Sequence, residues 1–234
     1  LRGAMAGAGG SVQVRFTRDL LEIDTTWAGV PTSFSAGGLT PFGHALKPDV
    51  SAPGANIISS TLPENAGDPF AISAGTSFSA PHVAGAAALL LQRHPTWTPR
   101  QVKSALMSTA GPAFADSTRT VEASVLVQGA GLARVGAADN PLLFTDPASL
   151  SFGYLDVNAG AASISVAPFA LGPGGTVVAQ MTATAAAGAP QGDNFGFVVL
   201  RRGADVRRIP YAFSVTRPQL GNAQVIPIRR SQTG

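Results

Sequence analysis

The stretch "ISAGTSFSAPHVAGAAALLLQRHP", residues 72–95, begins as a polar turn with a glycine and continues as an almost unbroken run of alanine and leucine. A serine in the first turn of a helix lies among backbone N–H groups without intrahelical partners, and these groups stabilise an anion. Ser77 can therefore attack a carbonyl carbon while its own N–H stabilises the oxyanion. Gly75 leaves room for the tight turn and for a substrate, since it has no Cβ. The run 83–91 has no polar face, which predicts a buried helix that holds the serine still.

Taken alone, Gly75-Thr76-Ser77 is also an ordinary helix-capping sequence. The wider stretch favours the catalytic interpretation, because "GTSFSAPHVAGAAALL" closely resembles the nucleophile segment of the subtilisin-like serine proteases, or subtilases, with its pattern G-T-S-x-A/S-x-P-H-V-A-G. The resemblance continues in "LKPDVSAPGANIISS" (46–60), in the helix "HPTWTPRQVKSALMSTA" (94–110) and in "VQGAGLARVGAA" (127–138), which is similar to the closing helix of these catalytic domains.

The resemblance implies a role for each residue of the motif. Ser77 is the nucleophile, and its backbone N–H contributes to the oxyanion hole. Gly75 and Thr76 support the turn and the hole, while Pro81 and His82 are structural members of the motif. His82 is not the catalytic histidine, because it would lie behind the serine and triads are recognised by geometry.

A base and its orienting carboxylate are not found by sequence. Subtilases have them upstream of the serine, but the 76 residues before Ser77 contain no D-T/S-G and no H-G-T-H-V segment. Asp24 lacks the following glycine, His44 is expected in a loop, and His94 ends the helix as a partner for its C-terminal charge. The oxyanion asparagine of the family is not identifiable either.

Two hypotheses follow. In the first, this is the C-terminal part of a subtilase, a serine endopeptidase acting through an acyl-enzyme on Ser77, with the Asp, His and Asn on an upstream segment; this isolated chain would then be inactive. In the second, the chain is a non-catalytic binding or structural module derived from a subtilase. The intact turn around Ser77 favours the first.

The expected architecture has two domains. Residues 1–140 are the C-terminal portion of an α/β, subtilisin-like catalytic domain, with a partial parallel sheet and the buried nucleophile helix; residues 1–28 resemble the tail of a protease-associated insert. Residues 141–234 resemble a fibronectin-type-III-like domain, an all-β sandwich. The elements expected from local patterns are strands at 29–38, 55–61 and 69–73, helices at 77–94 and 98–111, and strands at 163–170, 176–184, 195–202 and 206–215.

Two details of the β region are predicted as well. In the last strand, Ile209, Tyr211, Phe213 and Val215 share one face, which indicates a single buried side. Four arginines surround the hairpin turn at 203–205, and they either bind an anionic partner or form a solvated tip, the second being favoured; they are Arg201, Arg202, Arg207 and Arg208.

Composition excludes several classes of function. The chain has 234 residues, 12% charged residues, a net charge of +3 and no cysteine, so nothing indicates nucleic acid or a disulfide framework. The longest apolar run, 83–91, is far shorter than the roughly 20 residues of a membrane helix. No zinc, P-loop or dinucleotide pattern is present, and no cofactor or metal is assigned, although calcium is frequent in subtilases.

The start lacks an initiator Met and an apolar core, so it is interpreted as a cut within a longer protein. The family implies a secreted, extracellular enzyme with protein or peptide substrates.

Overall fold

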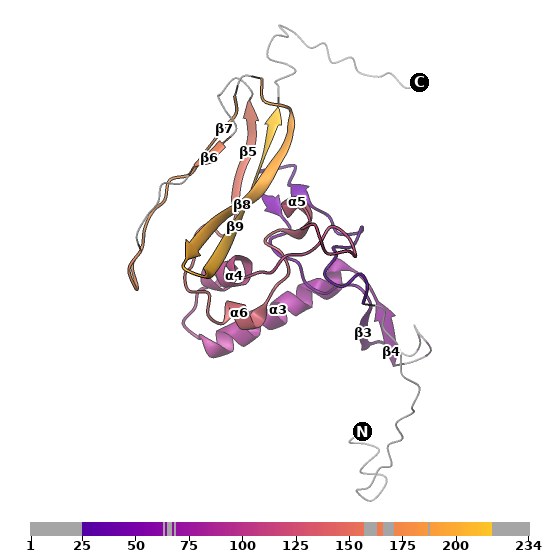
Figure 1. Ribbon diagram of the computed structural model, residues 1–234. Coiled ribbons are helices and arrows are strands. Elements are labelled where there is room, and N and C mark those ends of the chain that lie inside the picture. Colours follow the sequence, from indigo (N-terminus) through magenta and orange to yellow (C-terminus); the bar gives the residue numbers. More distant parts are fainter. Residues whose placement is uncertain are drawn as a thin grey trace, which may run out of the picture.

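The computed structural model describes residues 25–62, 64, 67, 69–156, 163–165, 171–186 and 188–216 (Figure 1). Predictions for residues 1–24, which include Asp24 and most of the expected insert tail, lie outside this part, as do those for 166–170 and for the end of the chain after 216. The elements before residue 140 are β1 (Gly38–Leu39), β2 (Leu46–Lys47), β3 (Ile57–Ser60), β4 (Phe70–Ser73), α3 (Thr76–Arg93), α4 (Pro99–Ser108), α5 (Val125–Gln128) and α6 (Val135–Ala138). Those after it are β5 (Leu150–Asp156), β6 (Ser163–Ser165), β7 (Thr182–Thr184), β8 (Gly192–Arg202) and β9 (Asp205–Thr216).

Helix α4 begins where the sequence predicts. The Thr98 side chain accepts a hydrogen bond from the Gln101 backbone N–H, and the Gln101 side chain accepts one from the Thr98 backbone, so the capping box is complete. The apolar face of α4 packs against α3 and α6 in a core made of Ala86, Leu90, Val102, Ala105, Leu106 and Ala138. This core fixes α3, which carries the candidate nucleophile at its first turn.

The expected parallel sheet is not present among the described residues before 140. Strand β1 pairs antiparallel with β2, and β3 pairs antiparallel with β4 as a hairpin that projects beside the start of α3 (Figure 1). The predicted strand 29–38 is also wrong: Ser35 N–H donates to Thr32 O in a turn, and only Gly38 belongs to a strand. Pro31 offers no N–H to a ladder, which explains the irregular backbone around it.

The predicted closing helix at 127–138 is two short helices. Gly129 and Gly131 have φ of 64° and 114°, left-handed values that end α5. Between α5 and α6 the backbone pairs with distant segments, because Ala130 N–H donates to Asp49 O and Leu132 N–H to Gly111 O. A continuous helix would lose these bonds.

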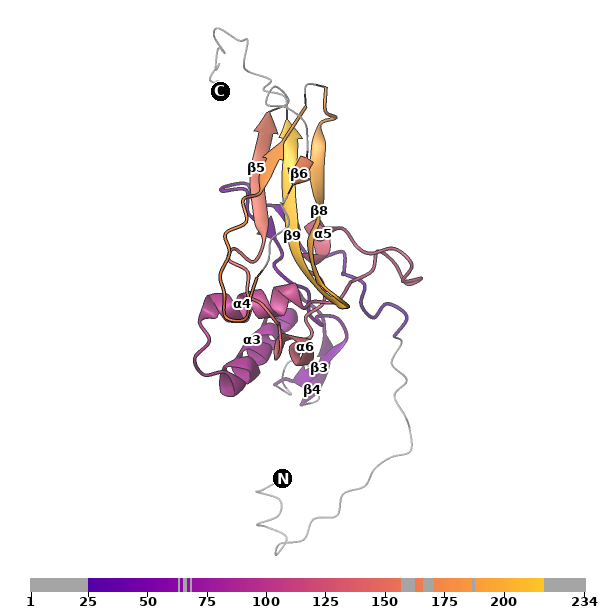
Figure 2. The ribbon, with the colours of Figure 1, turned by 60° about the vertical axis from the view of Figure 1, so that its left-hand side comes forward.

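The β region forms one three-stranded sheet in the order β5–β9–β8, with β5 parallel and β8 antiparallel to β9 (Figure 2). The predicted hairpin is confirmed, since Arg202 pairs with Asp205 across the turn. Strands β6 and β7 form a separate antiparallel pair. Within the described ranges this falls short of the two full sheets of the expected sandwich.

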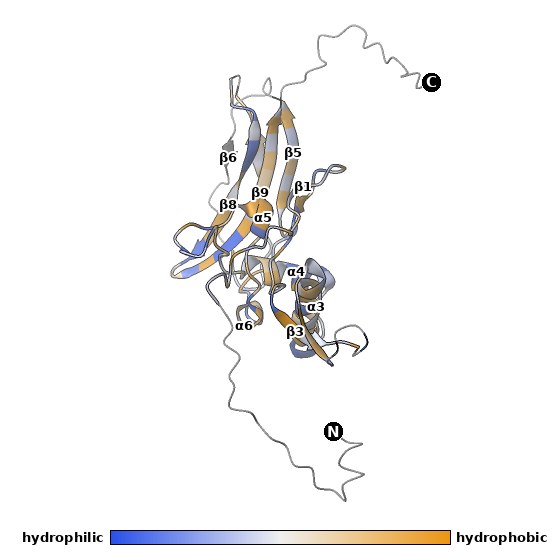
Figure 3. Cartoon of the chain, turned by 90° about the vertical axis from the view of Figure 1, so that its right-hand side faces the viewer, coloured by the Kyte–Doolittle hydropathy of each residue, from blue (hydrophilic) through white to orange (hydrophobic). Residues whose placement is uncertain are grey.

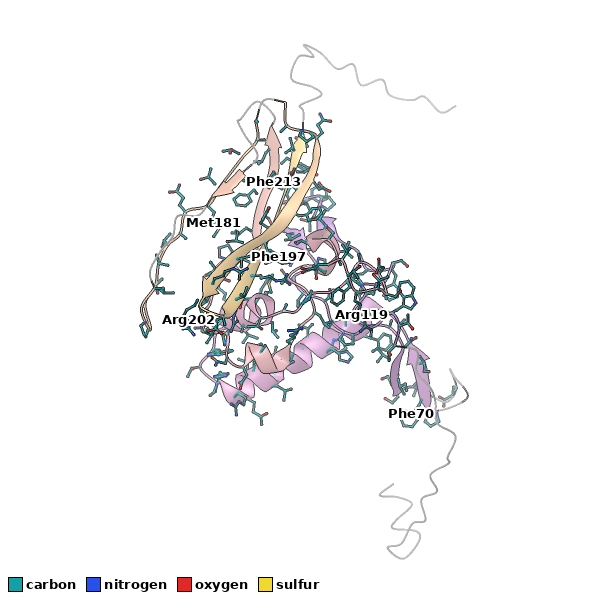
Figure 4. All side chains as sticks on the ribbon, in the orientation of Figure 1. Phe70, Arg119, Met181, Phe197, Arg202 and Phe213 are labelled. Carbon is teal, nitrogen blue, oxygen red and sulfur yellow. The ribbon has the colours of Figure 1, made fainter. Side chains whose placement is uncertain are left out.

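Strand β9 is buried on both faces, not on one as predicted. Phe213 and Val215 pack with Ala185 in the core of the β region, whereas Ala212, from the other face, packs with Leu46 and Val125 of the preceding part. The second face therefore belongs to a contact between the two halves of the chain. Figure 4 shows Phe197 and Phe213 along this sheet.

The arginines beside the hairpin divide into two groups. Arg201 and Arg202 are exposed, with Arg202 paired to Asp205, which fits a solvated tip. Arg208 donates to both carboxylate oxygens of Glu122, at 2.7 and 2.9 Å, and its guanidinium lies 4.0 Å from the Phe197 ring centroid. Arg207 Nε donates to Pro141 O at 2.7 Å. Arg207 and Arg208 therefore do not form a solvated tip; they attach the sheet to Pro141 and Glu122 of the preceding part of the chain.

Candidate active site

Ser77 lies at the second residue of α3, immediately after the β4 strand and a short turn. Its side chain is exposed, and none of the described residues forms a hydrogen bond with it. Gly75 occupies the N-cap position and supplies no side-chain hydrogen bond to the first turn. The positive end of the helix dipole therefore lies beside an unengaged hydroxyl.

The turn is held by backbone contacts to the segment formed by residues 51–54. Gly75 N–H donates to Gly54 O at 2.8 Å, and Phe78 N–H donates back to Gly75 O at 3.0 Å. A Cβ built on Gly75 would lie 3.0 Å from Ser77 Oγ. Glycine at this position thus keeps free the space directly beside the hydroxyl.

Thr76 faces a cavity of about 530 Å³ at the start of α3. Ser79, Ala80 and Val83 line the cavity from the helix, and the segments 27–35 and 48–55 line the opposite side; Ser77 is not among the lining residues. The structure therefore places Gly75, Thr76 and Ser77 in one turn, with Thr76 turned to the cavity and Ser77 to solvent.

Pro81 and His82 follow one turn later. Pro81 lacks the N–H that would bond to Ser77 O, so this carbonyl has no partner in the usual i to i−4 ladder. His82 Nδ1 lies 2.8 Å from Phe78 O, and because a carbonyl oxygen only accepts, this nitrogen carries the proton. The ring is thus bonded along its own helix.

The other two histidines lie away from this turn. His94, the C-cap residue of α3, places Nε2 2.9 Å from Asp139 Oδ1 and stacks on Trp97. The Arg93 guanidinium, followed by His94, lowers the pKa of Asp139. His44 packs edge-on against Tyr154 of β5, with ring centroids 4.2 Å apart. In the described part of the chain, no histidine is brought against Ser77.

The apolar helix behind the serine is largely exposed, which corrects the prediction that it is buried. Only Ala86 and Leu90 are buried, while Leu89 and Leu91 are 56% and 42% exposed. Ile58 and Ile72, paired across the β3–β4 hairpin, are also exposed, and Figure 3 shows apolar colour on β3 and α3. The elements that pack on α3 lie on one side of it, so the described residues leave the rest of its apolar surface uncovered (Figure 1).

Asp49 is the carboxylate most strongly engaged near the 51–54 segment. Its oxygens bind Lys103 at 2.8 Å and Lys47 at 2.6 Å. Burial is the largest single influence and raises the pKa of Asp49, but the hydrogen bonds and charges of Lys103 and Lys47 together outweigh it, so this pKa lies below its usual value. Asp49 is an anchor between the start of the 51–54 segment and α4, a role that the sequence did not indicate.

This arrangement predicts a pH-dependent contribution to stability. Because the folded-state pKa of Asp49 is lowered, the contribution is complete above the ordinary pKa of aspartate, near 4, and is lost as the pH falls through the folded-state value. We expect Asp49→Asn to lower the free energy of unfolding at pH 7 by about 1 kcal/mol, since both ion pairs are partly exposed. Urea titrations at pH 7, 5 and 3 check this, with Asp193→Asn as the exposed control; a deficit that stays equal at all three pH values contradicts it.

The residues that sequence reasoning missed are those that hold the turn: Ala52, Gly54 and Ser79. Ser79 Oγ donates to Ala52 O at 3.0 Å, and a Cβ on Gly54 would overlap this hydroxyl. All three lie within stretches that resemble the subtilase pattern, but no local signal shows that they meet. None of the helices within the described ranges is long and apolar enough to cross a membrane.

Known proteins with similar sequences belong to one class of protease. A model of the subtilase family matches residues 22–137. The subtilisin-like protease SBT3.2 of Arabidopsis thaliana is 38% identical over 136 residues, 52% of this chain and 18% of that protein. The minor extracellular protease Vpr of Bacillus subtilis (strain 168) is 38% identical over 122 residues, 51% of this chain and 15% of that protein. The chain thus spans less than a fifth of the length of these relatives. Residues 22–137, with Ser77 at the start of α3, therefore match the model of the subtilase family.

Proposed function

We propose that this chain supplies the nucleophile of a secreted serine endopeptidase. The observation that carries the proposal is the unengaged Ser77 hydroxyl at the N-terminus of α3, inside a region that matches the subtilase family. The relatives are named as proteases, and one of them as extracellular. The substrates proposed are proteins or peptides.

The chemistry proposed for Ser77 is acyl transfer in two steps. Ser77 Oγ bonds to the substrate carbonyl carbon and its proton passes to a base; when the C–N bond breaks, this proton goes to the leaving amine. Water then adds to the acyl-enzyme, and the product acid leaves as Oγ regains a proton. During both steps the carbonyl oxygen carries negative charge, which the Ser77 backbone N–H and the helix dipole stabilise.

We further propose that the base, its carboxylate and an oxyanion asparagine belong to an upstream segment, so that this chain alone is inactive. His82 is bonded to Phe78 O, and His44 and His94 contact other residues, which leaves Ser77 without a base among the described residues. The exposed Leu89 and Leu91 give an upstream segment an apolar helix surface to cover. Residues 141–234 are proposed as a fibronectin-type-III-like appendage, supported by the β5–β9–β8 sheet.

Labelling with a fluorophosphonate probe tests the proposal. The Ser77 oxygen would bond to phosphorus as the P–F bond breaks, and fluoride would leave with the hydroxyl proton taken up by the base. We expect a form of the chain extended upstream to label at Ser77, and this chain not to label, with Ser77→Ala as the negative control. If neither form labels although circular dichroism shows both to be folded, the chain is a non-catalytic module. If this chain labels alone, the proposal of an upstream base is wrong.

A further inference from the structure

We propose that Ser79 is a positioning residue for Ser77: its hydroxyl fastens the first turn of α3 to the 51–54 segment and so fixes the direction of the Ser77 side chain. The inference deepens the proposed function and rests on it, because it concerns how the nucleophile is held. Ser79 itself is not proposed to touch substrate.

The first turn of α3 is attached to the 51–54 segment at two points. The turn has no side-chain cap, yet two hydrogen bonds tie it to the same short segment: Gly75 N–H to Gly54 O at 2.8 Å, and Ser79 Oγ to Ala52 O at 3.0 Å. Ser77 lies midway between these two attachment points in the sequence. Its backbone is therefore held from both sides, by one backbone bond and one side-chain bond.

The hydrogen bond of Ser79 is not the local one that a helical serine usually makes. A serine inside a helix ordinarily bonds to the carbonyl four residues earlier or points to solvent. Ser79 instead bonds to a carbonyl 27 residues earlier in the chain and is partly buried, whereas Ser77 is exposed. One hydroxyl of the turn is thus committed to structure, while the other is free for chemistry.

The close approach of the 51–54 segment to Ser79 requires glycine at position 54. A Cβ on Gly54 would overlap Ser79 Oγ and would lie 2.9 Å from Gly75 O. The 51–54 segment approaches the turn this closely only because residue 54 is glycine. The contact therefore depends on the missing Cβ of Gly54 as well as on the hydroxyl of Ser79.

The 51–54 segment is itself held in place by hydrogen bonds. Ser51 N–H donates to Gly131 O at 2.8 Å, Ser51 Oγ donates to Gln128 O at 3.0 Å, and Ala133 N–H donates to Ser51 O at 2.9 Å. Gln128 is fully buried. Ser79 thus attaches the turn to a frame that cannot move freely, which is the requirement for a positioning contact.

The first measurement is amide hydrogen exchange on this chain. In Ser79→Ala the Gly75 N–H bond to Gly54 O should open more often, and we expect Gly75 to exchange about tenfold faster. Ser79→Thr keeps the hydroxyl and should restore slow exchange. Ala80→Ser, which adds a hydroxyl at the neighbouring exposed position and keeps Ser79, is the matched control and should leave the exchange rate of Gly75 unchanged. Equal exchange in Ser79→Ala and wild type overturns the inference.

The second measurement is the rate of fluorophosphonate labelling at Ser77 in the upstream-extended form. We expect Ser79→Ala to lower this rate about tenfold, because a misdirected nucleophile loses near-attack geometry, and Ser79→Thr to restore it. A peptide substrate should show the loss in kcat and not in KM. Faster exchange with an unchanged labelling rate overturns the positioning role. If the wild-type extended form does not label, the proposed function fails and the positioning role with it, while the exchange data still report whether Ser79 holds the turn.

Discussion

Replacing Ser77 by alanine in the upstream-extended form is expected to lower kcat for peptide hydrolysis by about 10⁴-fold or more, with little change in stability. The activity falls because the substituted residue has no oxygen to form the acyl-enzyme. Stability is preserved because the Ser77 side chain is exposed and makes no hydrogen bond within the described structure. Exposed substitutions of this kind usually change the free energy of unfolding by no more than about 0.5 kcal/mol.

The measurement pairs steady-state kinetics with a thermal melt of each variant. Ser60→Ala is the control, since Ser60 is an exposed serine on β3. It should retain full activity and an unchanged melting temperature. If Ser77→Ala keeps more than a tenth of the wild-type kcat, Ser77 is not the nucleophile; if it unfolds at a clearly lower temperature, the residue has a structural role that its exposed position does not show.

The elements predicted well from sequence are those whose signals are local. Helix α4 is the clearest case, because Thr98 and Gln101 form a capping box from residues three apart. The β8–β9 hairpin is another, since its Gly203 turn lies between two patterned strands. The start of α3 is a third case, because Gly75, Thr76 and Ser77 are consecutive and the helix begins at Thr76 with Gly75 as its N-cap.

The elements predicted wrongly depend on partners distant in the sequence. The period-2 pattern of β9 gave one buried face, but Ala212 on the other face packs against Leu46, more than 160 positions away. The apolar composition of α3 indicated burial, yet composition does not say which residues would cover the helix. Leu89 and Leu91 remain exposed because none of the described elements lies against them.

Sequence patterns also do not identify the polar residues that connect separate segments, because the partners of these residues are distant in the sequence. Arg208 is one of several arginines in the sequence, and only the fold shows that it reaches Glu122 and Phe197. Ser79 is one of several serines, and only the fold brings it to Ala52. The Gln128 side chain makes three hydrogen bonds, and its sequence context, "LVQGAG", contains no signal for a buried amide.

Gln128→Ala should be more destabilising than Asp49→Asn, because the Gln128 side chain bonds to both ends of the 113–123 loop and so fixes this loop to α5. It is fully buried; its Oε1 accepts from Ala113 N–H at 2.8 Å, and its Nε2 donates to Ala123 O at 2.6 Å and to Glu122 Oε1 at 2.9 Å. Truncation leaves the Ala113 N–H and the Ala123 carbonyl buried without partners, and each such group costs about 1–3 kcal/mol. We expect the free energy of unfolding to fall by about 3–4 kcal/mol. Urea titration measures this, with the exposed Gln92→Ala as a control that should change little.

Gln128→Glu separates lost hydrogen bonding from lost volume. The carboxylate keeps the acceptor for Ala113 N–H but cannot donate, and it places a second negative charge beside Glu122. At pH 7 this variant should therefore be destabilised at least as much as Gln128→Ala. At pH 4 a protonated carboxyl can donate to Glu122 again, so its deficit relative to wild type should shrink, whereas the deficit of Gln128→Ala should persist. If the loss of unfolding free energy in Gln128→Glu is the same at both pH values, the contact with Glu122 does not determine the stability of this region. Gln128 would then act only by filling space between α5 and the 113–123 loop.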